Sequence, residues 1–256
     1  MTGPEQANKE RFTDRVDTYV KYRPSYPAAA IDYLYGEAGL EAAGEVADIG
    51  AGTGIFSRLL LERGTSVTAV EPNRAMREAA ERALGGYPGF RAMDGAAEET
   101  GLADASLDFI VCAQAFHWFD QPAAKREWHR LLRPGGRAAL VWNTRLRSGT
   151  PFLEAYERLL LDLGTDYARV NHTNITQEQL AAFFASGTKR EARFPNRQLF
   201  DFDGLSGRLR SSSYTPVPGH PNYEPMLAEL RAIFDRYQQD GQVSFDYETE
   251  IYWGEV

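Results

Sequence analysis

The feature that most constrains this chain is a short apolar run, with an acid near its end, that passes directly into a glycine turn. Residues 46–49 form the run. Glycine then occupies every second position, at Gly50, Gly52 and Gly54. Glycine tolerates positive φ and lets another molecule approach the backbone, and the helical pattern that follows begins with free N–H groups. This order predicts strand, tight turn and helix, a junction that binds nucleotide-like ligands at the carboxyl ends of parallel strands.

The spacing of these glycines narrows the class of ligand. The dinucleotide fingerprint G-x-G-x-x-G would need a glycine at position 55, where the chain has Ile55. The spacing therefore argues against a nicotinamide-dependent oxidoreductase. A second apolar run, residues 66–70, ends directly before Glu71. This acid follows the glycines by roughly 20 residues, where such folds place a carboxylate on ribose hydroxyls.

Asp48, the glycine turn and residues 71–73 together resemble the class I S-adenosylmethionine-dependent methyltransferases. The resemblance implies S-adenosyl-L-methionine as the cofactor, with its methionine portion against Asp48 and the glycines. It also implies that the ribose hydroxyls donate to Glu71. Met76, in the next helix, would flank the adenine, or could equally be a core residue.

Two further segments belong to the cofactor site by the same resemblance. Residues 94–98 resemble the adenine-binding turn, in which Asp94 accepts from the exocyclic amine and the next backbone N–H groups meet ring nitrogens, although Asp-Gly is also a generic turn. Small residues at the end of a strand, Ala113 and Ala115 on either side of Gln114, would let the cofactor pass across it. The implied cofactor-binding residues are Tyr22, Arg23, Asp48, Gly50, Ala51, Gly52, Gly54, Glu71, Pro72, Asn73, Met76, Asp94, Gly95, Ala96, Ala113, Gln114 and Ala115.

A loop rich in tyrosine and proline, residues 19–27, precedes the glycine turn. It could be a surface loop packed by its own aromatic rings. A similar Tyr-Arg-Pro stretch precedes the core in several small-molecule methyltransferases, which implies a lid whose Tyr22 and Arg23 contact the methionine end. A guanidinium suits this role because it can hold a carboxylate by two parallel hydrogen bonds.

The pattern Ala-Phe-His-Trp-Phe at residues 115–119 looks like the methyltransferase type 11-like branch of small-molecule enzymes, which includes the trans-aconitate type. Imidazole titrates near neutrality, so His117 could be a catalytic base or a substrate hydrogen-bonding group. Alternatively, it orders the loop or touches the cofactor. We expect Tyr26, His117 and Trp118 to lie at the substrate, with Trp118 as a wall of the pocket.

Methyl transfer from a sulfonium is an in-line displacement with a neutral leaving group, so the protein mainly aligns donor and acceptor and excludes water. A base is needed only where the nucleophile must lose a proton early. The lack of a catalytic triad therefore does not argue against an enzyme. The sequence leaves open RNA or protein as the acceptor, and a non-catalytic module that binds S-adenosylmethionine.

The composition limits the choice of partners. The chain has 256 residues and a net charge of −8. Proteins that bind nucleic acids usually carry a basic surface, so this charge argues against such a partner. One cysteine, Cys112, cannot form an internal disulfide, which fits a reducing compartment. No apolar run reaches membrane-spanning length, and the four histidines show no metal-ligand spacing. We expect a cytoplasmic monomer or homodimer that acts on a small molecule, without metal, membrane or nucleic acid.

Strand and helix patterns alternate over the first 143 residues, which predicts a parallel sheet with helices on both faces. With the resemblance, the predicted fold is α/β: a Rossmann-like, doubly wound, seven-stranded and mostly parallel sheet, with a C-terminal antiparallel hairpin and a helical insertion on the substrate side. The predicted strands are residues 46–49, 66–70, 90–93, 106–112, 137–142, 191–200 and 243–253. The predicted helices are residues 12–20, 28–38, 55–64, 74–84, 122–132, 152–163, 176–184, 205–211 and 225–239.

The whole chain, residues 1–256, is expected to form one domain. Its predicted parts are an N-terminal helical lid (1–40), a cofactor-binding core (41–143), a helical insertion (144–190) and C-terminal strands and helix (191–256). Beyond residue 143 the resemblance is weaker. The neighbourhoods of Arg145, Arg147, His172 and Tyr214 could bind an acidic or polar acceptor, but the sequence does not place them together.

Overall fold

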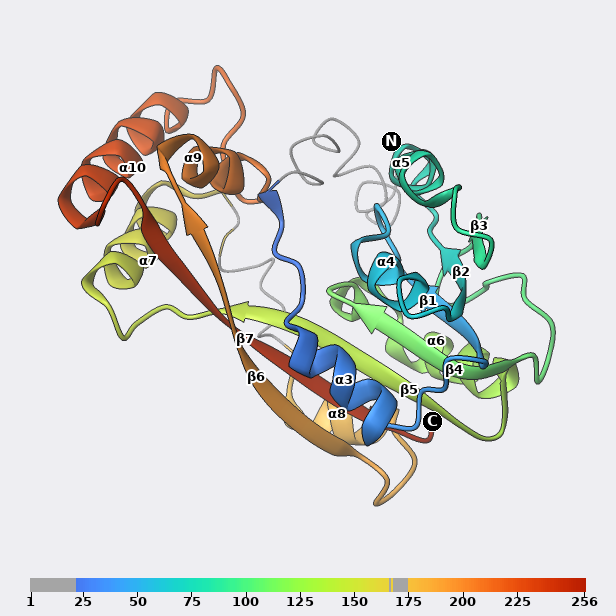
Figure 1. Cartoon of the computed structure of the whole chain (residues 1–256). Coiled ribbons are helices and arrows are strands. Elements are labelled where there is room, and N and C mark those ends of the chain that lie inside the picture. Colours follow the sequence, from blue (N-terminus) through green and yellow to red (C-terminus); the bar gives the residue numbers. More distant parts are fainter. Residues whose placement is uncertain (1–21, 166, 168–174) are drawn as a thin grey trace.

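The structure, a computed structural model, describes residues 22–165, 167 and 175–256 (Figure 1). The helix predicted over residues 12–20 and the candidate acceptor residue His172 lie outside these residues.

Seven strands form one sheet in the order β3-β2-β1-β4-β5-β7-β6. The strands are β1 (Glu45–Ile49), β2 (Ser66–Val70), β3 (Phe90–Met93), β4 (Leu107–Ala113), β5 (Leu132–Arg145), β6 (Arg190–Phe200) and β7 (Val243–Gly254). Strands β1 to β5 pair in parallel, whereas β7 runs antiparallel to both β5 and β6. The predicted fold class, with its mostly parallel sheet and antiparallel end, is confirmed.

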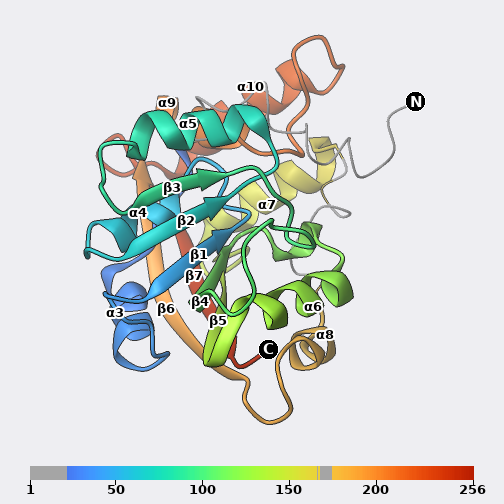
Figure 2. The same ribbon diagram turned by 90° about the vertical axis from the view of Figure 1, so that its right-hand side faces the viewer.

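Helices cover both faces of the parallel part, as Figure 2 shows. On one face α3 (Ala28–Gly36), α4 (Ile55–Leu61) and α5 (Arg74–Leu84) pack on the sheet through apolar side chains such as Leu34, Leu60 and Leu84. On the other face, α6 (Gln121–Leu131) and α8 (Gln177–Phe183) bury a cluster that includes Trp128 and Phe183. Because both faces are covered, the central strand β1 is buried at every residue after Glu45.

A third apolar cluster lies beyond the parallel strands. The long strands β5, β6 and β7 extend past the others, and α7 (Pro151–Leu163), α9 (Phe202–Arg210) and α10 (Tyr223–Tyr237) pack around their far ends (Figure 1). The helices α9 and α10 connect β6 to β7, so these two antiparallel neighbours are not joined by a tight turn. This arrangement sets the third cluster opposite the carboxyl ends of the parallel strands.

Several element boundaries differ from the sequence-based expectation, and two of the differences have a clear local cause. The turn expected at residues 134–136 lies inside β5, because pairing with β4 resumes after an irregularity around Gly135, whose φ is +82°. Helix α9 begins earlier than expected, at Phe202, because the Asp201 side chain accepts a hydrogen bond from the Gly204 N–H and caps the helix.

The cap predicted for α8 is present. Thr176 Oγ1 accepts from the Gln179 N–H at 3.2 Å, and Gln179 Oε1 accepts from the Thr176 N–H at 2.8 Å. This reciprocal pair is a capping box, which satisfies two backbone groups at the helix start. Within the residues that the structure describes, no helix combines the length and apolar character needed to cross a bilayer.

A glycine substitution tests how tightly α4 and α5 pack. A Cβ on Gly54 (φ +79°) would lie 2.5 Å from Leu84 Cδ1, whereas a Cβ on Gly64 (φ +84°) would meet no atom within 4 Å. Left-handed backbone costs an L-residue roughly 1–2 kcal/mol, and overpacking a core typically costs a further ~1–3 kcal/mol. Chemical denaturation should therefore show Gly54→Ala to be less stable than the control Gly64→Ala by at least about 1 kcal/mol. Equal losses would mean that the contact with α5 is loose.

Candidate functional site

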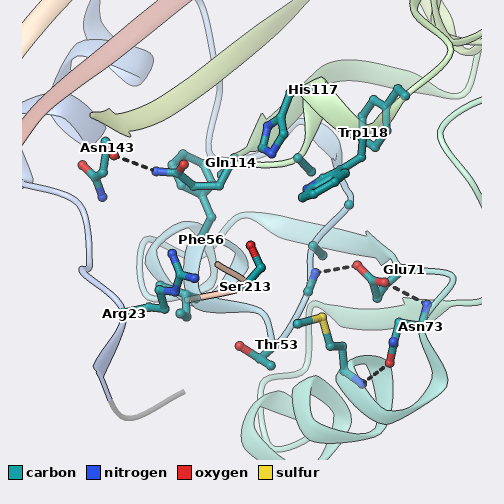
Figure 3. A pocket seen from close by; sticks show the side chains of 18 of the residues that line it. Arg23, Thr53, Phe56, Glu71, Asn73, Gln114, His117, Trp118, Asn143 and Ser213 are labelled. Atoms are coloured by element: carbon teal, nitrogen blue, oxygen red, sulfur yellow. Dashed lines mark hydrogen bonds between the residues drawn. The ribbon is translucent and has the colours of Figure 1, made fainter. Parts of the chain in front are cut away.

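A cavity of about 320 Å³ opens where the parallel strands end, between the core and the third apolar cluster (Figure 3). Its floor comes from the segments that follow β1, β2 and β4, and its far wall from the end of β5 and the segment after α9. The carboxyl edge of a doubly wound sheet is where such folds bind their ligands. The predicted site residues that line it are Arg23, Tyr26, Asp48, Gly50, Ala51, Gly52, Glu71, Pro72, Asn73, Met76, Ala96, Ala113, Gln114, Ala115, His117 and Trp118.

Four predicted cofactor-binding residues do not line the cavity, each for a local reason. Asp94 is largely exposed because its carboxylate pairs with the Arg77 guanidinium of α5, at 3.0 Å. Gly95 packs against Thr100, where a Cβ would lie 2.6 Å from the carbonyl oxygen. Gly54 faces α5, as described above, and the Tyr22 ring packs on Gly207 of α9. In place of the Asp-Gly pair, Ala97 and Glu98 line the cavity beside Ala96.

The turn after β1 brings bare backbone to the cavity. Gly50 and Gly52 have φ values of +73° and +58°. A Cβ on Gly50 would lie 2.5 Å from Ala115 Cβ, so this glycine permits the close approach of the β4 end. A Cβ on Gly52 would have one neighbour within 4 Å, Met76 Sδ at 3.8 Å, and would take up cavity space instead. The turn therefore presents an open backbone surface to a ligand.

Asp48 is a buried carboxyl with one unsatisfied oxygen. Its Oδ2 accepts from the Ser57 hydroxyl at 2.6 Å, while its Oδ1 has no hydrogen-bond partner among the described residues. Burial raises the pKa of Asp48 to about 7, an effect that the Ser57 hydrogen bond opposes and the negative charge of Glu71 reinforces. A buried acceptor without a donor is costly, and a cationic ligand group would relieve that cost.

Glu71 is held in place by backbone donors from two elements. Its Oε2 accepts from the Gly52 N–H and its Oε1 from the Asn73 N–H, both at 2.8 Å. Asn73 in turn caps α5, because its side chain accepts from the Met76 N–H at 3.0 Å. Burial raises the pKa of Glu71, although these two backbone hydrogen bonds act in the opposite direction. Each oxygen retains accepting capacity toward the cavity.

The segment after β4 contributes aromatic and polar side chains. His117 and Trp118 lie in the short 3₁₀ helix η2 (Phe116–Trp118), with their ring centroids 4.6 Å apart, and both line the cavity (Figure 3). Gln114 has a φ of +64°, and its N–H donates to the Val141 carbonyl at 2.8 Å. A non-glycine residue in this conformation is strained, and such residues concentrate at functional sites.

The Tyr-Arg-Pro segment is tied down at two points beside the cavity. The Arg23 guanidinium donates to the Ser211 carbonyl at 2.9 Å. The Ser25 carbonyl accepts from the side-chain amides of Asn143 and Asn196, at 3.2 and 2.8 Å. Tyr26 packs edge-on against Phe56 with ring centroids 4.9 Å apart. These contacts join residues from four parts of the chain, so local sequence patterns could not reveal them.

The far wall of the cavity carries arginines that the sequence did not bring together. The residues that line this wall include Arg145, Arg147, Tyr167, Arg208 and Tyr214. The sequence had suggested Arg145, Arg147 and Tyr214 as acceptor-binding residues, without bringing them together. Arg208 had no local signal, because a single cation in an amphipathic helix is usually solvated. Ala97 and Glu98 belong to the predicted segment 94–98, and Phe119 to the motif at residues 115–119. The remaining lining residues that sequence analysis missed are Pro24, Thr53, Ile55, Phe56, Asp120, Asn143, Thr144 and Ser213.

Comparison with known proteins finds similarity mainly in the parallel part of the sheet and its helices, where the cavity floor lies. The profile of a methyltransferase domain family matches residues 47–140. An uncharacterized methyltransferase of Mycobacterium tuberculosis is 47% identical over 134 residues, which are 52% of this chain and 52% of the relative. The chain thus spans about half the length of this relative.

Two longer matches extend over most of the chain. An uncharacterized methyltransferase of Geobacillus thermodenitrificans is 30% identical over 185 residues, covering 69% of this chain and 83% of the relative. The structure of a candidate type II methyltransferase from Anaeromyxobacter dehalogenans superposes with a TM-score of 0.67 at 25% identity, covering 91% of this chain and 98% of that one.

The buried carboxyl of Asp48 should make the free energy of unfolding depend on pH. The folded protein keeps this proton up to about pH 7, whereas the unfolded chain releases it near its ordinary pKa of 3.8. Between these values, stability should fall as pH rises, by up to about 1.4 kcal/mol per pH unit from this group. The free energy of unfolding, measured by urea denaturation from pH 4 to 8, should fall less steeply in Asp48→Asn.

Asp162→Asn, at an exposed position on α7, is the matched control and should follow the wild-type profile. Parallel profiles for wild type and Asp48→Asn would contradict the assignment of a proton to the buried carboxyl.

Proposed function

The chain belongs to the class I S-adenosylmethionine-dependent methyltransferases, and we propose that it transfers a methyl group from S-adenosylmethionine to a small molecule. The observation that carries this proposal is the pairing of an open glycine turn with two buried carboxyl groups, Asp48 and Glu71, at one end of a cavity.

The polar groups at this end fit such a cofactor. Asp48 Oδ1 and Thr53 Oγ1 are buried beside the turn without partners among the described residues. The first could accept from the ammonium of an amino acid, and the open space at Gly52 admits an extended ligand against the backbone. Glu71 would accept from the ribose hydroxyls, with Asn73 and Met76 beside it, and Arg23 would hold the carboxylate by charge-assisted hydrogen bonds.

When bound, S-adenosylmethionine supplies an electrophilic methyl carbon that a lone pair of the acceptor attacks, while the carbon–sulfur bond breaks and its electrons stay on sulfur. The residues of this chain would contribute alignment and exclusion of water. Tyr26 and Trp118 would form walls around the acceptor. His117 would take up the proton of an acceptor that loses one, or would donate a hydrogen bond to an acceptor that does not.

A small acceptor is favoured over RNA or protein by two features. The cavity of about 320 Å³ falls at the lower end of the usual range for small-molecule sites. The net charge of −8 disfavours a polyanionic partner. The trans-aconitate-type resemblance of residues 115–119 supports the same choice and remains part of the proposal.

We further propose that the chain forms one domain in which different segments bind the cofactor and select the acceptor. Residues 41–143 would bind the cofactor, while residues 1–40, 144–190 and parts of 191–256 would close over it and select the acceptor. A cytoplasmic location and a monomeric or homodimeric state remain predictions.

Glu71 provides a direct test of the cofactor site. Glu71→Ala should weaken binding of S-adenosylhomocysteine by at least about 1–3 kcal/mol, because ribose hydroxyls and two backbone N–H groups lose their acceptor. Isothermal titration calorimetry on folded protein measures this change. Glu78→Ala, at an exposed position on α5, is the control and should bind normally. Unchanged affinity in Glu71→Ala would remove this residue from the site.

The acceptor class is tested by transfer of a labelled methyl group to panels of small acids, amines and phenols, with RNA and protein assayed in parallel. We expect label in one small-molecule class. Label only in RNA or protein would reject the small-molecule proposal, and binding of S-adenosylhomocysteine without any transfer would favour the non-catalytic module.

The role of His117 is tested once an acceptor is known. His117→Asn should lower kcat, and the loss should shrink at high pH if the residue removes a proton from the acceptor. Unchanged turnover would exclude His117 as a base.

A further inference from the structure

Arg208 is a buried cation for which the described part of the protein supplies no counter-charge. Its Nε donates to Tyr247 Oη at 3.1 Å and its Nη1 to Ser212 Oγ at 2.8 Å. Its guanidinium also lies 5.6 Å from the centroid of the Phe245 ring. Within the described residues, no carboxylate pairs with it. Arg208 is 5% exposed and lines the cavity, and a guanidinium stays charged in proteins.

Two further arginines raise the positive charge at the same wall. Arg145 donates to the Glu157 carboxylate and, at 2.8 Å, to Tyr167 Oη. Arg147 approaches the other oxygen of Glu157, with its Nε at 3.8 Å. Both arginines line the cavity, so one carboxylate faces two guanidinium groups while Arg208 adds a third positive charge nearby.

The pKa of Tyr214 reflects the positive electrostatic potential at this wall. Burial alone would raise the pKa of Tyr214, but the positive charges of Arg208 and Arg145, with a hydrogen bond to Ser212 and the charge of Arg23, hold it below its ordinary value. The acids that line the cavity near the glycine turn, Asp48 and Glu71, belong to the opposite end. The cavity therefore has one wall with three arginines and another end with two buried carboxyl groups.

We propose that the acceptor carries an anionic group, a carboxylate or a phosphate, that binds Arg208 and Arg145 at the wall with three arginines. Isolated buried charge is costly, and an anionic ligand with hydrogen bonds to guanidinium groups would supply the missing compensation. The inference rests on the proposed function, because it assigns the glycine-turn end of the cavity to the cofactor and the far wall to the acceptor. It adds the charge of the acceptor, which the cofactor site does not determine.

The experiment measures binding of small anions to protein saturated with S-adenosylhomocysteine. The probes are succinate, benzoate and inorganic phosphate, with succinamide and benzamide as neutral counterparts, titrated by calorimetry. We expect at least one anion to bind and its neutral counterpart not to bind. Carboxylate and phosphate arms distinguish the two chemical sources of the charge.

Arg208→Met keeps the apolar stem and removes the charge. We expect it to weaken binding of the anion by at least about tenfold, the scale of a lost hydrogen bond to a charged partner. Its affinity for S-adenosylhomocysteine should stay within about twofold of wild type, which also shows that the variant folds. Arg210→Met, two residues further along α9 and exposed, is the matched control and should bind both ligands normally.

Glu157→Gln supplies a change of opposite sign. Removing this carboxylate frees the charge of Arg145 and Arg147, so the anion should bind several-fold more tightly. A structural role of the ion pair alone would give unchanged or weaker binding.

The outcomes separate the two proposals. Absence of S-adenosylhomocysteine binding to wild type would count against the proposed function. Normal binding of S-adenosylhomocysteine with no anion bound, or equal binding of anion and amide, would overturn this inference alone. Loss of S-adenosylhomocysteine binding in a folded Arg208→Met would also overturn it, because the counter-charge would then be the carboxylate of the cofactor.

Discussion

The hydrogen bonds between the Glu71 carboxylate and the backbone at Gly52 and Asn73 are the contacts on which the site depends. One carboxylate bridges the turn after β1 and the start of the helix after β2, each at 2.8 Å. It fixes the floor of the cavity and leaves acceptor capacity facing inward. Because these bonds use backbone donors, they require the turn itself, and the turn requires glycine at positive φ.

The cavity is built from two structural layers that the chain order keeps apart. The parallel half supplies a floor with buried carboxyl groups, Asp48 and Glu71. The helices packed around the long strands supply a wall with Arg145, Arg147 and Arg208. The amides of Asn143 and Asn196 hold the segment around Ser25 between these layers. A ligand with a cationic and an anionic end, or two ligands of opposite local charge, would match this polarity.

Sequence patterns predicted what depends on neighbours along the chain. The bounds of β2, β3 and α5 agree with the patterns at residues 66–70, 90–93 and 74–84 because alternation, caps and glycine stops are local signals. The capping box of α8 is likewise written in two residues three positions apart.

Contacts between segments that are distant in the sequence could not be predicted from local sequence patterns. Asp94 follows a strand as the resemblance requires, yet Arg77, from another element, draws its carboxylate to the surface. Arg145 and Arg208 line the same wall, although α7, α8, β6 and most of α9 lie between them in the sequence. No sequence period or motif predicts that these two arginines lie at the same wall, because their positions depend on how the third apolar cluster packs.

The glycine turn and Glu71 are proposed to hold S-adenosylmethionine rather than a dinucleotide. Calorimetric titration of the full chain with S-adenosylhomocysteine and, separately, with NAD tests this assignment most directly. We expect saturable one-to-one binding of S-adenosylhomocysteine and no heat of binding for NAD. Saturable binding of NAD with none of S-adenosylhomocysteine would contradict it.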